Sequence, residues 1–316
     1  MRLQTQIPIK RQQHNQIDYN SKLFLLGSCF SDNIYNKLEY YKLDACSNPF
    51  GIQYHVIGIE KLISRAINQS YFIEDEFVRS DEAYFSFDAH SKWTSRTAED
   101  LCQKLNAQLD EAHNWITTAT HVIITLGTAW VYRYIESDSI VSNCHKIPQK
   151  RFLKELLSTE AIAESLEGII TLARSVNPKV NFIFTVSPIR HIKDGFIENN
   201  RSKAHLLSAL HMLVDPKIGN YYFPSYEIQM DELRDYRFYN ADMLHPNALA
   251  IDIIWERFAQ TWLSDNALRT MVEVEAIQKG LNHKPFNPNS KGFDDFKRNL
   301  QAKIEDLQRQ HPRIQF

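Results

Sequence analysis

Three residues that together could perform acyl transfer lie where the sequence predicts turns. Ser28 follows the apolar run KLFLL, and Asp242 and His245 stand three residues apart before a strongly apolar segment. A serine hydroxyl attacks a carbonyl carbon when a neutral imidazole takes its proton, and a carboxylate fixes the tautomer of that imidazole. Asp242 is close enough to His245 in sequence to fold back and accept a hydrogen bond from its ring.

Each of these residues also has an ordinary structural explanation. A serine that follows a strand commonly caps the next helix, and an aspartate near a histidine commonly stabilises a turn. Pro246 is expected to begin the next helix, which would put His245 at the positive end of the helix dipole, where a neutral imidazole is favoured. From the residues alone, the catalytic and the structural interpretation both stay open.

The elements that must position these side chains alternate between strands and helices. Four short apolar runs predict strands buried on both faces, and a fifth run, interrupted by a proline, predicts a weaker strand. These runs span residues 22–26, 43–46, 121–126, 180–186 and 221–228. Apolar residues three and four apart predict helices over 31–41, 53–68, 99–119, 159–175, 201–214 and 248–263. The alternation predicts an α/β fold, with helices on both faces of a mostly parallel sheet.

Two insertions and a tail interrupt this alternation. Residues 71–93 and 130–148 read as hairpins that leave the carboxyl ends of strands, where α/β proteins build their sites. Beyond residue 265 the pattern is helical and ends in an amphipathic helix over 293–310. We therefore expect a catalytic domain at 1–265 and a C-terminal helical extension at 266–316. The extension would pack on the domain or on a second copy of the chain, as in a homo-oligomer.

Composition and missing motifs exclude several classes of function. The 36 Lys and Arg against 38 Asp and Glu give a net charge of −2, which argues against a general nucleic-acid binder. The polar N-terminus lacks a secretion signal and no run is long enough to span a membrane, so we expect a cytoplasmic protein with four reduced cysteines and no membrane partner. Without CxxC, HExxH, Walker or GxGxxG motifs, we expect neither a metal nor an organic cofactor.

Other polar side chains near strand ends are candidates for contact with a substrate. Arg190 and His191 follow the fourth strand and are expected to recognise a substrate carboxylate or hydroxyl. Asn143 and His145 lie in the second insertion and are expected to line the cleft. Cys29 neighbours Ser28, but we expect it to be a buried, inert thiol.

The run LGSCF at residues 26–30 resembles the signature of the GSCFA family, which belongs among the SGNH/GDSL-like hydrolases. The resemblance spans roughly residues 1–265 and continues in order through NPFGI, SFDAHS, LGTAWVY, VSNCHK, SPIRHIKDGFIENNRSKA, YYFPSYEI and DELRDYRFYNADMLHPN. It implies a flavodoxin-like three-layer α/β/α fold and esterase-type or acyl-transfer chemistry. Ser28 matches the family's nucleophile position, and Asp242 and His245 match its DxxH pair.

The sequence departs from the broader superfamily in its oxyanion hole. The N–H groups of Ser28 and Gly51 are expected to hold an oxyanion. The superfamily usually adds an asparagine in its third conserved block, but LGTAW has none. Thr128, or an asparagine from elsewhere such as Asn48 or Asn143, would then supply the missing donor.

The function predicted from these residues is that of a serine esterase. Its substrate would be an acyl ester of a small molecule or glycan, with Ser28 as nucleophile, His245 as base and Asp242 orienting the base. An O-acyltransferase would use the same three residues, with a sugar hydroxyl in place of water. A non-catalytic binding or scaffold protein could also keep this fold.

Overall fold

The computed structural model describes residues 5–287 and 289–316, and its centre is a parallel sheet of five strands. The strands are β1 (Lys22–Gly27), β2 (Asp44–Ser47), β5 (His121–Leu126), β9 (Asn181–Val186) and β10 (Asn220–Tyr222). Their order is β10-β9-β5-β1-β2. Counted along the chain within this sheet, that is 2-1-3-4-5, the flavodoxin-like order. The predicted α/β fold with a mostly parallel sheet is confirmed.

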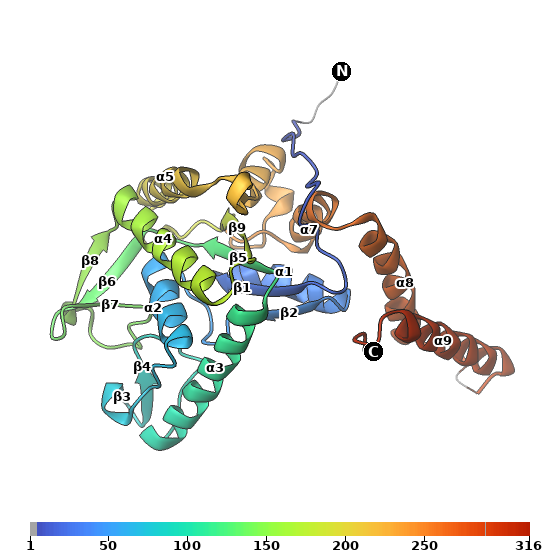
Figure 1. Cartoon of the computed structure of the whole chain (residues 1–316), viewed down its shortest axis with the longest axis horizontal. Coiled ribbons are helices and arrows are strands. Elements are labelled where there is room, and N and C mark those ends of the chain that lie inside the picture. The colour runs from blue at the N-terminus through green and yellow to red at the C-terminus, as the bar shows by residue number, and fades with distance from the viewer. Residues whose placement is uncertain (1–4, 288) are drawn as a thin grey trace.

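Helices cover both faces of the sheet (Figure 1). One face carries α1 (Cys29–Tyr40), α7 (Ala248–Trp262) and α8 (Asp265–Leu281), and the other carries α2 (Val56–Ile67), α3 (Ala98–Thr118), α4 (Thr159–Val176) and α5 (Phe196–Leu213). Alternate strand residues point to opposite layers: Leu23 and Leu25 pack under α1 and α7, while Phe24 and Leu26 pack under α2 and α3. The result is the expected three-layer arrangement.

The two insertions form small antiparallel sheets. The first contains the hairpin β3 (Phe77–Ser80) and β4 (Ala83–Ser86), as predicted. The second contains three strands, β6 (Trp130–Tyr134), β7 (Ser139–Val141) and β8 (Phe152–Leu156), in the order β7-β6-β8. The predicted hairpin ended at Pro148 and omitted β8, whose side chains are mostly half-buried or exposed and give a weak apolar signal.

The weak fifth run was only partly a strand. β10 has three residues, and after Pro224 the chain turns into short helical segments, Ser225–Glu227 and Ile228–Glu232. A proline offers no N–H to a strand ladder, which explains why pairing stops there.

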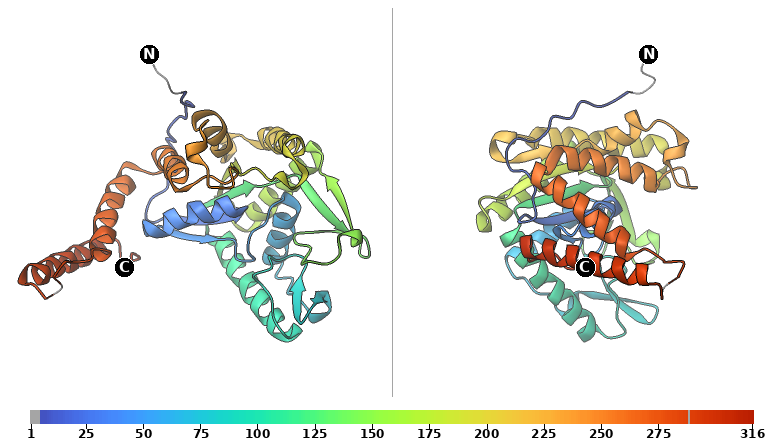
Figure 2. Two further views of the ribbon diagram at one scale, coloured as in Figure 1. Left: turned by 180° about the vertical axis from the view of Figure 1, so that it is seen from behind. Right: turned by 90° about the vertical axis from the view of Figure 1, so that its right-hand side faces the viewer.

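The C-terminal segment is helical, as expected. After α8, α9 (Lys291–Gln310) projects from the sheet domain, and residues 311–316 turn back toward it (Figures 1 and 2). Ile304, Leu307 and Ile314 are buried in the same apolar cluster as α1 and α7. Within residues 5–287 and 289–316, no helix has the length and apolarity needed to cross a membrane.

Candidate active site

Ser28 stands at the junction of β1 and α1, where a tight backbone contact fixes it. Gly27 has φ +130°, and a Cβ there would stand 2.1 Å from the carbonyl oxygen of Thr125 on β5, so only glycine fits. The N–H of Ser28 donates to that same oxygen at 3.0 Å. Ser28 is the N-cap residue of α1, and its Oγ accepts from the N–H of Phe30 at 3.4 Å, a long contact that leaves the hydroxyl loosely held.

This position is the topological switch point of the sheet. β1 and β5 are neighbours, but the chain leaves β1 toward β2 on one side and continues from β5 toward β9 on the other. In doubly wound α/β proteins, ligands bind outside the carboxyl ends of the strands at such a point. Ser28 follows β1 and Gly127 follows β5, so both lie at this edge.

Asp242 and His245 form a hydrogen-bonded pair. Nδ1 of His245 lies 2.6 Å from Oδ2 of Asp242, while Oδ1 accepts the backbone N–H groups of Leu244 and His245 at 2.9 and 3.0 Å. The N–H groups of His245 and Leu244 and the His245 ring hold the pKa of Asp242 down at about 2. The carboxylate is therefore ionised at neutral pH, and it favours the tautomer whose Nε2 is free to accept a proton.

The segment that carries this pair differs from the prediction in one respect. Asn247 caps α7, accepting the N–H of Ala250 at 3.1 Å, and the helix begins at Ala248. Pro246 therefore precedes the cap and is not the first helical residue. His245 lies two residues before the cap, and the contact with Asp242, rather than the helix dipole, orients its ring.

The nucleophile candidate and the Asp–His pair occupy different environments. Ser28 is fully buried, whereas the side chains of Asp242 and His245 are 44% and 46% exposed. Between these two described regions, no hydrogen bond joins Ser28 to His245. Catalytic hydrogen bonds are often long in ligand-free structures and tighten when substrate binds.

His191 lies between them. A Cβ placed on Gly127 would stand 3.3 Å from Nε2 of His191 and 3.3 Å from Cβ of Ser28, so both side chains lie close to Gly127 and to each other. Burial, the Lys203 ammonium and then His245 lower the pKa of His191 to about 3. The ring is therefore neutral, and it is near both Lys203 and His245.

Lys203 is a fully buried lysine close to His191. Its Nζ donates to the carbonyl oxygens of Gly127 and Ser187, both at 2.8 Å, and so ties the ends of β5 and β9 together. Burial lowers the pKa of Lys203 to about 7. Burial also raises the pKa of the neighbouring Cys29 thiol, which favours the inert, protonated form that we expected.

The residues expected to complete an oxyanion hole make hydrogen bonds to neighbouring residues in this structure. The N–H of Gly51 donates to the carbonyl oxygen of Asn48 at 2.7 Å. The Asn48 amide accepts from the N–H of Gly27 and donates to Asp32, both at 2.8 Å. The Thr128 hydroxyl lies 3.1 Å from that of Ser202 and accepts the N–H of Trp130. These contacts hold Gly51, Asn48 and Thr128 in the ligand-free structure, and the oxyanion roles expected of them remain predictions.

The second insertion also uses its polar residues internally. Oδ1 of Asn143 accepts the N–H of His145 at 3.0 Å, and Nε2 of His145 lies 2.6 Å from the carbonyl oxygen of Ser86. The His145 ring stacks on Phe85 with 4.8 Å between ring centroids. His145 thus joins the two insertions, and the expectation that Asn143 and His145 line the cleft remains a prediction.

Arg190 is placed where a substrate could meet it. It lines a pocket of about 490 Å³ together with Asp242, Met243 and Leu244, so this pocket opens beside the Asp–His pair. Its guanidinium contacts the sulfur of Met230 at 2.9 Å. The expectation that Arg190 contacts a substrate remains a prediction.

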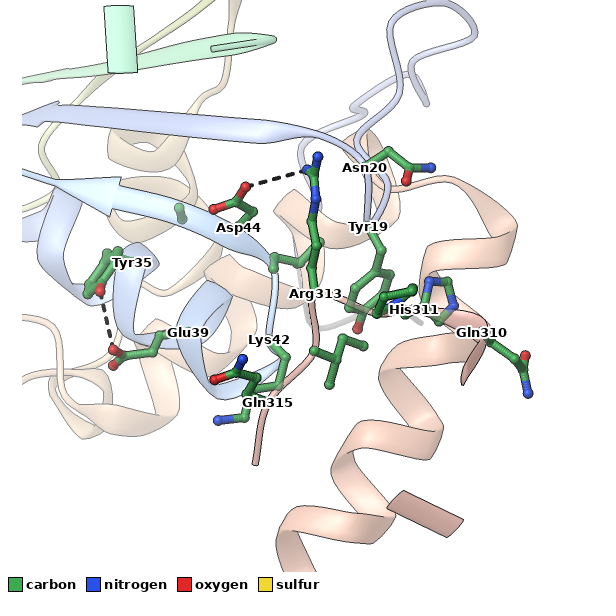
Figure 3. A pocket seen from close by; sticks show the side chains of 14 residues that line it. Tyr19, Asn20, Tyr35, Glu39, Lys42, Asp44, Gln310, His311, Arg313 and Gln315 are labelled. Carbon is green, nitrogen blue, oxygen red and sulfur yellow. Dashed lines mark hydrogen bonds and ion pairs between the residues drawn. The ribbon is translucent and has the colours of Figure 1, made fainter. Parts of the chain in front are cut away.

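A larger pocket, of about 610 Å³, lies elsewhere. It forms where residues 310–315 return to the edge strand β2 and to α1, and its residues include Tyr19, Glu39, Asp44 and Arg313 (Figure 3). Arg313 approaches Asp44 at 3.7 Å, and Tyr35 donates to Glu39 at 3.2 Å. None of the residues that line it belongs to the candidate site.

Two site residues were missed from the sequence. Lys203 precedes Leu206 by three residues and Leu210 by seven, which places it on the apolar stripe of α5. Asn199, four residues earlier, is also buried, and its Oδ1 accepts the N–H of His191 at 2.9 Å. A lysine and an asparagine on an apolar stripe are a detectable signal of a buried polar site. Among the described residues, no group of three or more His, Cys, Asp or Glu could hold a metal ion.

Together these features define an α/β protein with a serine and an Asp–His pair at the carboxyl edge of its sheet. Residues 22–258 match the GSCFA family, and residues 274–316 match the C-terminal domain of GSCFA domain proteins. The chain therefore belongs to the GSCFA family.

Comparison with solved structures found distant likenesses, two of which are esterases. One is the crystal structure of an acetyl esterase mutant with acetate ion, with a TM-score of 0.37 and 8% identity over 80% of this chain and 99% of the other. The second is a carbohydrate esterase family 3 protein from Talaromyces cellulolyticus, with a TM-score of 0.38 and 8% identity over 81% of this chain and 99% of the other. These values are too low to assign an activity. A comparison with curated protein sequences found no match.

Proposed function

We propose that this protein is a serine esterase of the SGNH type that hydrolyses an acyl ester of a small molecule or glycan. Ser28 is the nucleophile, His245 the general base and Asp242 the group that orients His245. The observation that carries the proposal is the 2.6 Å contact between Asp242 and His245, in a segment that shares a pocket with Arg190, which follows β9. A turn-stabilising aspartate needs only its backbone bonds, whereas Asp242 also holds the imidazole ring.

The chemistry follows from this arrangement. Ser28 Oγ bonds to the acyl carbon while its proton passes to Nε2 of His245, and the carbonyl electron pair moves onto oxygen. When the carbonyl re-forms, the alcohol leaves with the proton from His245, and an acyl-serine remains. Water then attacks the acyl-serine by the same steps and releases the acid. Asp242 stays ionised throughout, because its pKa of about 2 is far below neutrality.

The pocket beside Asp242 supports a small, polar substrate. Its volume of about 490 Å³ is in the range of small-molecule sites, roughly 300–1,000 Å³. Arg190 and Arg234 supply donors, and the exposed ring of Tyr236, near that of Tyr239, offers an apolar face of the kind that sugars stack on. This combination suits a sugar or a polar alcohol better than a long acyl chain.

Solvent access favours hydrolysis over acyl transfer. With nearly half of its side chain exposed, His245 can activate a water molecule directly from solvent. A transferase must exclude water from the acyl-enzyme, and nothing covers the Asp–His pair to that extent in the described chain.

The proposal is tested with a fluorophosphonate probe and a short acyl ester such as p-nitrophenyl acetate. The wild-type protein should be labelled on Ser28 and should release p-nitrophenol, and Ser28→Ala should lose both properties, since a triad nucleophile supplies about 10⁶ in rate. Cys29→Ala is the matched control and should keep both, because partial burial raises the pKa of the Cys29 thiol and favours its protonated form. A Ser28→Ala variant with wild-type turnover would reduce Ser28 to a helix cap.

A further inference from the structure

An esterase of this kind needs a hydrogen-bond donor that the expected residues do not supply in the ligand-free structure. The N–H groups of Ser28 and Gly51 both donate to backbone carbonyl oxygens. The Asn48 amide and the Thr128 hydroxyl are each engaged with neighbouring residues. Since the loss of one oxyanion donor costs about 10²–10³ in rate, a working site must draw a donor from elsewhere.

His191 has an unused polar atom in the right place. Its Nε2 is inaccessible to solvent and has no hydrogen-bond partner among the described residues. A buried imidazole nitrogen without a partner is costly, unless a ligand supplies the partner. That nitrogen and Cβ of Ser28 both lie 3.3 Å from the point where a Cβ on Gly127 would stand. The two atoms are therefore at most about 6.6 Å apart, close enough for the carbonyl group of one ester bound at Ser28 to reach this nitrogen.

The surrounding residues hold the ring in place from several sides. The N–H of His191 donates to Oδ1 of the buried Asn199 at 2.9 Å, which fixes the backbone. The ring packs edge-on against Tyr54, with 5.4 Å between centroids and 81° between planes. Lys203 binds the carbonyl oxygens of Gly127 and Ser187, and so fixes the ends of β5 and β9.

We infer that His191 is a catalytic residue of this site, and that the Nε2–H of its neutral imidazole donates to the oxyanion formed when Ser28 attacks the ester. The inference rests on the proposed function. When Ser28 attacks, the carbonyl electron pair moves onto oxygen and the serine proton goes to His245. His191 keeps its ring proton throughout, and the hydrogen bond from its Nε2–H to the substrate oxygen becomes stronger as that oxygen becomes negative.

The local charges suit a donor better than a second base. Burial, Lys203 and His245 together lower the pKa of His191 to about 3, so the ring carries one N–H at any working pH. An imidazole with so low a pKa is a poor proton acceptor. Among the residues that the structure describes, His191 also has no carboxylate partner comparable with Asp242, which holds the ring of His245.

The test compares two substitutions that separate the ring from the donor. His191→Phe keeps a ring against Tyr54 but loses the N–H, and His191→Gln loses the ring but keeps an N–H donor. With p-nitrophenyl acetate, we expect kcat to fall about 10²–10³-fold in His191→Phe with little change in KM. We expect the kcat of His191→Gln to be at least tenfold higher than that of His191→Phe. The rate of Ser28 labelling by the fluorophosphonate should follow the same order, since the phosphonyl oxygen needs the same donor.

Each other outcome overturns the inference in a recognisable way. If both variants turn over at the wild-type rate, His191 only packs. If His191→Gln is as slow as His191→Phe while both melt at the wild-type temperature, the donor is not what matters. A wild-type protein that neither labels on Ser28 nor cleaves the ester overturns the proposed function itself, and the oxyanion role with it.

Discussion

The two halves of the candidate site are built in different ways. Ser28, His191 and Lys203 lie in a buried half, held by bonds between strand ends that are distant in sequence; Lys203, for example, reaches Gly127 across 76 residues. Asp242 and His245 lie in an exposed half, held by bonds within the loop that precedes α7.

The pKa values in the two halves are shifted by different physical causes, and each cause suits a different role in the proposed reaction. In the buried half, loss of solvent dominates, and it lowers the pKa of both His191 and Lys203. In the exposed half, local hydrogen bonds dominate and lower the pKa of Asp242. A buried, neutral donor suits an oxyanion hole, and an exposed imidazole with a carboxylate partner suits a base that must exchange protons with water.

The largest effect within the exposed half should come from Asp242→Asn. The substitution keeps the shape of the turn but replaces the carboxylate that accepts the His245 N–H, so the ring is no longer held in the tautomer that accepts a proton. We expect kcat on p-nitrophenyl acetate to fall about 10³–10⁴-fold. Asp265→Asn, which changes an exposed carboxylate that pairs with Arg11 at the start of α8, is the control and should leave the rate unchanged. Equal rates in the two variants would mean that Asp242 only shapes its turn.

A smaller effect should come from filling the space of the buried half. In Gly127→Ala the new methyl would stand 3.0 Å from the carbonyl oxygen of Tyr54 and 3.3 Å from both His191 Nε2 and Ser28 Cβ. Displacing these groups by a fraction of an ångström should cost roughly 10²-fold in kcat. Gly292→Ala in α9, where a Cβ meets no atom within 4 Å, is the matched control. Wild-type kinetics in Gly127→Ala would show that the ester does not occupy this space.

The strands and helices of the sheet domain could largely be predicted from the sequence. β5 was predicted residue for residue, because all six of its side chains are buried and four of them, Val122, Ile123, Ile124 and Leu126, are aliphatic. β8 was missed because four of its five side chains are half-buried or exposed. The start of α5 was placed at residue 201 and not at Phe196, because its first turn carries exposed apolar residues and an asparagine pair that resemble a loop.

The candidate site could be predicted only where its contacts are local. The pairing of Asp242 with His245 follows from a spacing of three residues, and it is present. Arg190 and His191 were recognised as polar residues after a strand, but nothing in the sequence tells which way a side chain turns. Lys203 was missed because lysine usually faces solvent, and its two acceptors, at the ends of β5 and β9, come together only in the folded sheet.

The smallest effect concerns Lys203 and the stability of the buried half. Burial lowers its folded-state pKa to about 7 from the ordinary 10.5, so between these two values the unfolded chain binds a proton that the folded chain does not. The free energy of unfolding should therefore gain a contribution that rises with pH across this window, by roughly 1–2 kcal/mol between pH 7 and 9. Lys203→Met cannot titrate and should lack that rise.

Urea unfolding of both proteins at several pH values measures this contribution as a difference. The difference is needed because cysteine thiols also titrate near pH 9. Burial raises the folded-state pKa of thiols such as Cys29, so their contribution to the free energy of unfolding falls as the pH rises. These thiols are shared by wild type and variant, so they cancel. A difference that stays constant from pH 7 to 9 would mean that Lys203 remains a full cation on its two carbonyl oxygens, and that the buried half tolerates a charge as readily as the exposed half does.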